Sequence, residues 1–306
     1  MASTHAQCVF RAQALNGECP RWNVRERRLY WVDMRAPALH RLDPLTGVDE
    51  SWPMPSWIGC YAFCDDGSLL VALRTGLFRF DPSDLELRFR APPPYNPLRF
   101  CFNDGGCDRQ GRFHVGPLHD PLTAEPEGAP DAAPVWRLEG STWKAATAPV
   151  TIANGLAWSP DGRTLYHADT ARKTIWAMAY DEVTGQAEAP RLFARIEEGG
   201  EIGGPDGAAV DRDGFYICAI FGEGCLLRLD PDGKVERRIA VPARYPTMPA
   251  FGGDDLATLY VTTASFPIPE QARRGHPDDG AVFALEAPVP GLPASPYRPD
   301  VEGPFP

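Results

Sequence analysis

The feature that most constrains the fold is an internal repeat built around Asp-Gly turns. Each copy reads as an apolar strand, a turn, a second strand, and a third strand that ends before an Asp. Three clear copies are AFCDDGSLLVALRTGLFRFD at 62–81, LAWSPDGRTLYHADTARKTIWAMAYD at 156–181, and AAVDRDGFYICAIFGEGCLLRLD at 208–230. Self-similarity of this kind is the mark of repeat architectures, in which every copy is one structural unit.

Weaker copies at 21–43, 106–140 and 249–286 bring the total to six, or 51 residues each over the 306-residue chain. This length suits one four-stranded antiparallel blade, and the alternation in RLYWVD and TLYVTT is typical of half-buried strands. A β-sandwich would show no regular repeat of this length. The sequence therefore predicts an all-β fold: a six-bladed β-propeller of four-stranded antiparallel blades, with residues 1–306 as a single domain.

Composition agrees with this fold. The 33 prolines and 29 glycines would interrupt any long helix, while a hydrophobic content of 43% fills a sizeable core. We interpret the Pro-rich segment 92–97 and the insertion 123–134 as loops between or within blades. The last copy is one strand short, so residues Cys8–Ala14 are predicted to pair with Ala281–Leu285 and to close the ring, which removes an exposed sheet edge.

Several function classes are excluded. The net charge of −11 and the lack of a basic run argue against nucleic acid as a partner. There is no signal-like start and no run long enough to span a bilayer, which predicts a cytoplasmic protein without a membrane partner. The eight cysteines show no C-x-x-C pair, so reduced thiols are expected. Ser159 lies in a turn rather than in a G-x-S-x-G elbow, which argues against serine catalysis. We expect a monomer or a weak homo-oligomer.

The repeat also supplies an alignment in which the turn glycine is the reference point. Counting back eight residues gives Asn103, Asn154 and Asp206 in three copies, and Glu18 in the first, where Glu26 replaces the glycine. Equivalent positions before the innermost strand of each blade lie at the same radius and height in a propeller. These four side chains are therefore expected to converge on one point of the central channel. In the other two copies the slot holds Gly59 and, approximately, Thr247 or Met248.

Two carboxylates and two amides form an oxygen cage that suits one divalent cation. Ca²⁺, Mg²⁺ or Mn²⁺ fit such hard ligands, and Zn²⁺ or Fe²⁺ are possible. The alternative is that the four polar groups only cap turns and bond to the channel wall. Against that alternative, burial of Glu18 and Asp206 without a cation would be costly.

Several segments together resemble the gluconolactonase and regucalcin (senescence marker protein) family of six-bladed propellers. They lie between about Asn16 and Leu285: NGECPRWNVRERRLYWVDMRAPALHRLDP, FNDGGCDRQGRFHVG, ANGLAWSPDGRTLYHADT, PDGAAVDRDG and PTMPAFGGDDLATLYVTTA. The resemblance implies a single divalent metal (Ca²⁺, Zn²⁺, Mn²⁺, Mg²⁺ or Fe²⁺) held by Glu18, Asn154 and Asp206. It also implies that Asn103 and Asp104 lie at the substrate.

This sequence departs from the family pattern near Asn103. The slot two residues before it, where the family usually has an Arg that contacts sugar hydroxyls, holds Cys101, with Arg99 displaced by two. Where some members have a Thr-Met pair, this chain has Pro117 and Leu118, followed by His119. We expect Cys101 to face the substrate slot and His119, on a loop, to compete for the role of the missing Arg, with an altered substrate preference as the result.

The expected activity is metal-dependent hydrolysis of a sugar (aldono-) lactone to the sugar acid. A metal polarises the ring carbonyl and lowers the pKa of bound water, and a carboxylate, for which we choose Asp206, takes the proton. Glu18 and Asn154 hold the ion. Two alternatives stay open at this point: a phosphotriester hydrolase of similar construction, and a non-catalytic Ca²⁺-binding regulator.

Overall fold

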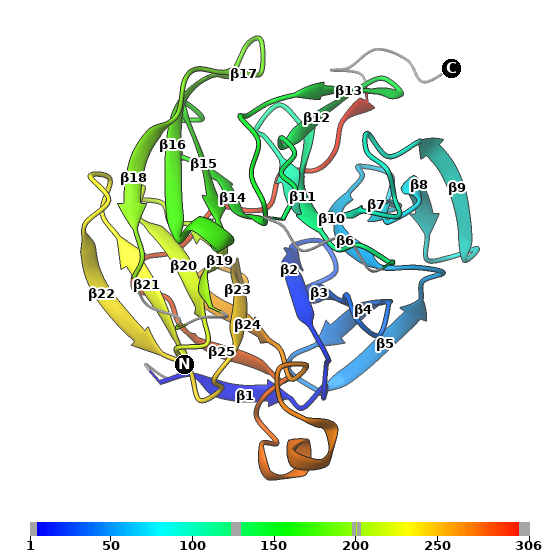
Figure 1. The fold of residues 1–306 in the computed structure, drawn as a ribbon. Coiled ribbons are helices and arrows are strands. Elements are labelled where there is room, and N and C mark those ends of the chain that lie inside the picture. Colours follow the sequence, from blue (N-terminus) through cyan, green and yellow to red (C-terminus); the bar gives the residue numbers. More distant parts are fainter. Residues whose placement is uncertain (1–4, 124–129, 198–199, 201–202, 300–306) are drawn as a thin grey trace.

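The strands are arranged as six blades around a central axis, as predicted (Figure 1). The computed structural model describes residues 5–123, 130–197, 200 and 203–299. Four of the six blades contain four antiparallel strands in chain order from the axis outward, which is the arrangement that the repeat requires; the fourth and sixth blades vary it. The predicted loop 92–97 connects two blades, whereas part of the predicted loop 123–134 lies outside the described residues.

The first three blades are regular. They consist of β2 (Gly17–Asn23), β3 (Arg28–Asp33), β4 (Ala38–Asp43) and β5 (Val48–Pro53); β6 (Ile58–Phe63), β7 (Leu69–Leu73), β8 (Gly76–Asp81) and β9 (Glu86–Ala91); and β10 (Phe100–Cys107), β11 (Phe113–His119), β12 (Trp136–Glu139) and β13 (Thr142–Ala145).

The fifth blade is regular, whereas the fourth blade has an additional short strand, β17, that also pairs with β16. They consist of β14 (Ala153–Trp158), β15 (Thr164–Asp169), β16 (Thr174–Asp181), β17 (Gln186–Ala187) and β18 (Arg191–Arg195); and β19 (Gly204–Val210), β20 (Tyr216–Phe221), β21 (Cys225–Leu229) and β22 (Val235–Ala240). Two 3₁₀ helices, η1 (Thr170–Arg172) and η2 (Glu270–Gly275), occur in loops, and no helix in the described residues is long and apolar enough to cross a membrane.

The sixth blade closes the ring. Strands β23 (Pro246–Gly252), β24 (Thr258–Thr263) and β25 (Val282–Glu286) are completed by β1 (Gln7–Phe10), which comes from the other end of the chain. Cys8 lies opposite Phe283 in this antiparallel pair. The predicted closure is therefore confirmed, although the pairing strand is Gln7–Phe10 and does not extend to Ala14; β25 gains a second hydrogen-bonded neighbour, and β1 becomes the outer strand of the blade.

Burial follows the distance from the axis. All residues of β10 are buried, as are all but one of β14, whereas β22 on the outside is almost entirely exposed. No disulfide joins the eight cysteines, all of which lie in the described part of the chain, in agreement with the prediction of reduced thiols. Apolar side chains thus fill the space between blades, and polar groups on the innermost strands stand out as exceptions.

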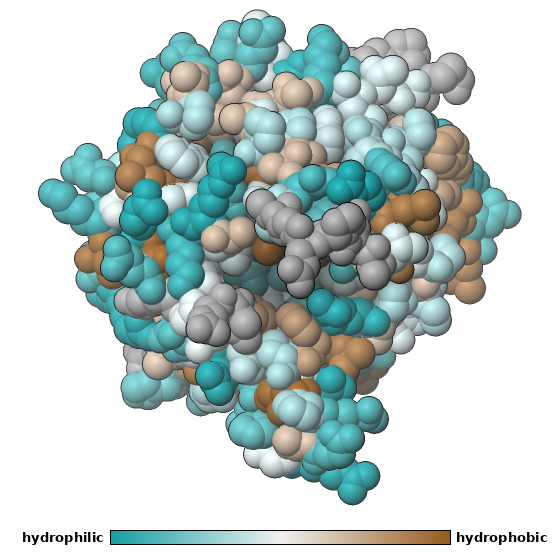
Figure 2. Space-filling model, in the orientation of Figure 1, coloured by the Kyte–Doolittle hydropathy of each residue, from teal (hydrophilic) through white to brown (hydrophobic). Residues whose placement is uncertain are grey.

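The C-terminal segment crosses one end of the propeller. Gly291 forms a bridge with Asp211, and Tyr297 forms one with Cys64. Both partners lie in or beside turns that follow the innermost strands. The opposite end, where the innermost strands begin, is the face seen in Figures 1 and 2, and its mostly hydrophilic surface is hollowed near the middle.

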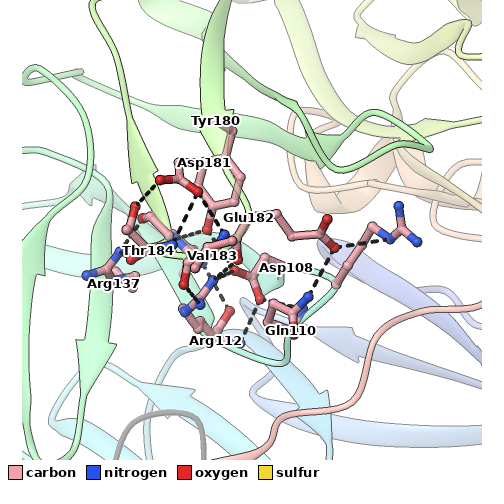
Figure 3. Close-up of polar contacts among 12 residues, drawn as sticks. Asp108, Gln110, Arg112, Arg137, Tyr180, Asp181, Glu182, Val183 and Thr184 are labelled. Carbon is pink, nitrogen blue, oxygen red and sulfur yellow. Dashed lines mark hydrogen bonds and ion pairs between the residues drawn. The ribbon is translucent and has the colours of Figure 1, made fainter.

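A buried polar cluster joins the third and fourth blades (Figure 3). We call it the Asp108 cluster; it consists of Asp108, Gln110, Arg112, Arg137, Tyr180 and the backbone of 182–184. The Asp108 carboxylate accepts hydrogen bonds from the backbone N–H groups of Gln110 (3.0 Å) and Arg112 (2.9 Å), from Arg112 Nη1 (2.8 Å) and from the Tyr180 hydroxyl (2.7 Å). Arg112 in turn donates to the carbonyls of Glu182 and Val183. These hydrogen bonds hold the third and fourth blades together.

Candidate active site

Each innermost strand is irregular near its start. The register with the second strand shifts after Glu18 in β2, after Phe102 in β10, after Asn154 in β14 and after Pro205 in β19. Such bulges bend a strand and change the direction of its side chains, and they are common beside functional sites. The four residues selected by the turn register lie at these bulges: Glu18, Asn103, Asn154 and Asp206.

The bulges turn these side chains, together with Asp104, toward the axis. All five are buried, with at most 7% of the residue surface exposed. The Asn103 Nδ2 group donates to Asn154 Oδ1 at 2.8 Å and to the Ala153 carbonyl at 2.9 Å. The structure therefore brings Asn103 and Asn154 together across two blades, as the register predicted.

A threonine that the sequence analysis missed anchors this arrangement. Asn154 Nδ2 donates to Thr170 Oγ1 at 2.8 Å, and the Thr170 hydroxyl donates to the Pro205 carbonyl at 2.7 Å, one residue before Asp206. Both NH₂ groups of the asparagine pair are thus occupied by protein acceptors. The amide orientation of Asn154 is fixed, and its oxygen is turned toward Asn103.

Three carboxylates lie close enough to repel one another. Burial raises the pKa of Glu18 well above its usual range, and the charges of Asp206 and Asp104 raise it further. Burial also raises the pKa of Asp206, with Asp104 adding to the effect. Burial raises the pKa of Asp104 to about 6, although the Leu156 N–H and the Arg21 guanidinium oppose the shift. The charged forms of all three are therefore destabilised in the protein alone.

These carboxylates have few partners of their own. Glu18 accepts the Cys19 N–H at 3.2 Å and Asp104 Oδ2 accepts the Leu156 N–H at 2.8 Å, while Asp104 Oδ1 is buried without a partner. Within the described residues no Lys or Arg forms an ion pair with Glu18, Asp104 or Asp206. Buried charges are normally paired or bound to a metal. The donor set consequently fits a divalent cation.

The amide is essential to that fit. Among the described residues, no three His, Cys, Asp or Glu side chains alone are placed to hold a metal ion. A cage here needs the Asn154 oxygen beside the carboxylates of Glu18 and Asp206, and such an all-oxygen set suits hard cations. The equivalent positions of the second and sixth blades hold Gly59 and Thr247, so neither adds a carboxylate. A side chain at Gly59 would clash with the Phe102 carbonyl, and the Thr247 hydroxyl donates to the Gly17 carbonyl.

Comparison with known proteins now places the chain. A model of the SMP-30/Gluconolactonase/LRE-like region matches residues 16–265. The chain belongs to this family. Its sequence is 38% identical over 288 residues to a 6-deoxy-6-sulfogluconolactonase from Pseudomonas putida, covering 93% of this chain and 96% of the relative. It is also 35% identical over 272 residues to an L-arabinolactonase from Azospirillum brasilense, with 88% of each chain covered.

Solved structures agree with the fold. The crystal structure of a calcium-binding protein, regucalcin from Agrobacterium tumefaciens, superposes with a TM-score of 0.88 at 26% identity, covering 97% of this chain and all of the other. The resemblance drawn from the sequence motifs is thus confirmed, and the lactonase relatives support lactone hydrolysis as the activity of this SMP-30/gluconolactonase family member.

Cys101 and His119 lie where the sequence departs from the family pattern. Cys101 is fully buried, its Sγ lies 3.9 Å from the Leu118 carbonyl, and burial raises its thiol pKa. It offers no surface to a ligand in this conformation. His119 is the last residue of β11 rather than part of a loop, and its Nε2 lies 4.0 Å from Asp131.

Arg21 is a further residue that sequence reasoning missed. Its guanidinium lies 5.7 Å from the Tyr61 ring centroid, donates to the Gly105 carbonyl and acts electrostatically on Asp104. The only signal was its place three residues after Glu18, where a bulge turns it back toward the axis. The Arg21 charge lowers the pKa of Asp104 and so opposes part of the rise that burial causes.

Proposed function

We propose that this protein hydrolyses an aldonolactone to the corresponding sugar acid, with one divalent cation held by Glu18, Asn154 and Asp206. The observation that carries the proposal is the group of three buried carboxylates and two amides, in which no carboxylate forms an ion pair with a Lys or Arg of the described chain. The choice of lactone hydrolysis as the reaction is supported by the sugar lactonases among the relatives of this chain. The regucalcin relative, described as calcium-binding, supports the choice of cation.

Asp206 is proposed both as a ligand and as the base. Glu18, Asn154 and Asp206 would hold the cation, which when bound would polarise the lactone carbonyl and lower the pKa of water. Asp206 is the carboxylate proposed to accept the proton of the attacking water. The water oxygen bonds to the carbonyl carbon, the bond from that carbon to the ring oxygen breaks, and the proton passes to the ring oxygen. The product is the open-chain acid.

Asn103 and Asp104 are proposed to orient the substrate. The NH₂ group of Asn103 is fixed by two acceptors, which leaves its oxygen for the cage or for a substrate hydroxyl. Asp104 Oδ1, buried without a partner, is suited to accept a hydrogen bond from a sugar hydroxyl. Cys101 and His119 remain in the proposed substrate region; the buried Cys101 would act through the shape of the wall.

The test is turnover of a panel of aldonolactones, with gluconolactone and arabinonolactone among them, after metal removal and after addition of Ca²⁺, Mn²⁺ or Zn²⁺. We expect hydrolysis that a chelator abolishes and added cation restores. Turnover unaffected by exhaustive chelation would contradict the metal role. Tight Ca²⁺ uptake without turnover of any lactone would favour a binding-only protein instead, and an organophosphate in the panel tests phosphotriester hydrolysis.

A further inference from the structure

One exposed arginine at the face of the site stands out by its surroundings. Arg35, in the loop between β3 and β4, has its guanidinium carbon 4.1 Å from the ring centroid of Phe266 and 5.8 Å from that of Trp57. The three residues come from the sixth, first and second blades. We call this group the Arg35 rim.

The Arg35 rim is tied to the axial site by hydrogen bonds. The buried Asp33 carboxylate accepts the N–H groups of Arg35 and of Leu15, three residues before Glu18. The Phe266 N–H donates to the Leu15 carbonyl at 2.9 Å. The Trp57 indole N–H donates to the carbonyl of Phe102, beside Asn103, also at 2.9 Å. The position of the Arg35 rim is therefore fixed relative to Glu18 on one side and to Asn103 on the other.

The charge of Arg35 is available to a ligand. Among the other arginines that lie over aromatic rings, Arg41 and Arg228 are each paired with two carboxylates, whereas Arg21, Arg191 and Arg244 have no ion pair among the described residues. In the described part of the chain Arg35 has no carboxylate partner, although the protein carries a net charge of −11. Its charge also reaches the Cys101 thiol, two residues before Asn103, where it opposes the rise in pKa that burial causes.

We propose that the Arg35 rim is a specificity site that binds an oxyanion carried by the lactone at the end remote from its carbonyl. A guanidinium donates two parallel hydrogen bonds to a sulfonate or phosphate, and the aromatic rings hold the guanidinium in place while covering the apolar face of the sugar. The positive charge of Arg35 at this face also offsets the repulsion that an acidic protein exerts on an anionic substrate. The inference rests on the proposed lactonase function and names its substrate class.

The experiment compares gluconolactone with its 6-phosphate and its 6-sulfonate analogue on wild type, Arg35→Met and Arg191→Met. Arg191 is the matched control, because it lies over the Phe193 ring at 5.8 Å on the outer strand β18, away from the site. We expect Arg35→Met to lower kcat/KM for an anionic lactone by at least about 10-fold and for the neutral lactone by less than about twofold. Arg191→Met should leave all three unchanged.

The salt dependence gives a second readout. The advantage of wild type over Arg35→Met on the anionic lactones should shrink as ionic strength rises, because salt screens an exposed charge. A loss confined to one of the two anionic lactones identifies which oxyanion the rim selects. Equal losses on charged and neutral lactones, or no loss on either anionic lactone, would overturn the proposal.

The design separates this inference from the proposed function. If wild type hydrolyses no lactone, the proposed function fails, and the rim is then tested by calorimetric binding of 6-phosphogluconate against gluconate. Tighter binding of 6-phosphogluconate that Arg35→Met removes would support an oxyanion site without turnover. Identical affinities in wild type and Arg35→Met would refute it.

Discussion

Two buried aspartates four residues apart, Asp104 and Asp108, show how the same side chain serves two purposes. Asp108 receives four hydrogen bonds, including those from Arg112 Nη1 and the Tyr180 hydroxyl (Figure 3). Asp104 Oδ2 accepts the Leu156 N–H, the N–H groups of Gly105 and Gly155 also lower the pKa of this carboxyl, and Oδ1 is buried without a hydrogen-bond partner. A buried carboxylate with every partner supplied by the chain stabilises the fold, whereas one left short of partners marks a place for a ligand.

The repeat shows that this contrast is systematic. Asp211 stands three residues before its turn glycine, as Asp108 does, and it accepts two backbone N–H groups and the Arg228 guanidinium. Asp206, near the start of the same strand, has no paired cation among the described residues. At the far end of the innermost strand the aspartate is thus fully paired in two blades, whereas the near end carries the residues of the proposed site.

The largest expected effect is on activity, and it comes from a substitution at the near end of an innermost strand. Asp206→Asn should lower lactone hydrolysis by about 10²- to 10⁴-fold, because an amide cannot accept the proton of the attacking water. Circular dichroism of the metal-free variant should resemble that of wild type, and its thermal stability should be equal or higher, because the substitution removes one of three buried carboxylates that repel one another. The measurement is turnover across a full titration of divalent cation.

The titration distinguishes a base from a ligand. Weakened cation binding alone is restored by excess cation, whereas loss of a base is not. Asn154→Asp is the companion variant: it keeps the base and adds a negative ligand but loses the NH₂ donor to Thr170 Oγ1, so it should retain partial activity that is reached at lower cation concentrations. Full recovery of Asp206→Asn at saturating cation would show that Asp206 is only a ligand and that the base is Asp104 or Glu18.

The features of the fold and of the proposed site that could be predicted are those that recur with the period of the repeat, and contacts between residues far apart in the chain could not be predicted. Six blades and the closing strand β1 follow from a period that is visible in the sequence, and the turn glycine aligns four residues of the site. The grouping of Asp104 and Arg21 with them depends on bulges, and a bulge changes side-chain direction without a fixed sequence mark. The Tyr180–Asp108 contact joins residues 72 positions apart, and Arg35, Trp57 and Phe266 come from three blades. Periodicity does not report such contacts.

The next effect is on stability rather than on catalysis. Asp108→Asn should lower the free energy of unfolding by about 2 to 4 kcal/mol, because it leaves the largely buried Arg112 guanidinium without its carboxylate. Denaturant unfolding measures this directly. Activity per folded molecule should stay within about twofold of wild type, since the Asp108 cluster contacts none of the proposed ligands. A variant as stable as wild type would mean that the backbone carbonyls of 182–183 suffice to hold Arg112.

The smallest effect concerns pH and the metal-free protein. The pKa of Asp104 is raised to about 6 in the folded state, while an unfolded Asp titrates near 4. Between these values the folded protein retains a proton that the unfolded chain has released. The free energy of unfolding should therefore fall as pH rises through this window and stay lower above it.

Asp104→Asn removes the titrating group while keeping an oxygen for the Leu156 N–H. It also removes the charge that raises the pKa values of Glu18 and Asp206, so both changes act in the same direction. Between pH 4.5 and 7.5, in chelator, wild type should lose about 1 to 2 kcal/mol more stability than the variant. With Ca²⁺ the sign should reverse for wild type, because the cation binds the charged carboxylates and its stabilisation grows as they lose their protons. Identical pH profiles for the two proteins in chelator would mean that Asp104 is as well compensated as Asp108, and the contrast between the two aspartates would then be one of geometry alone.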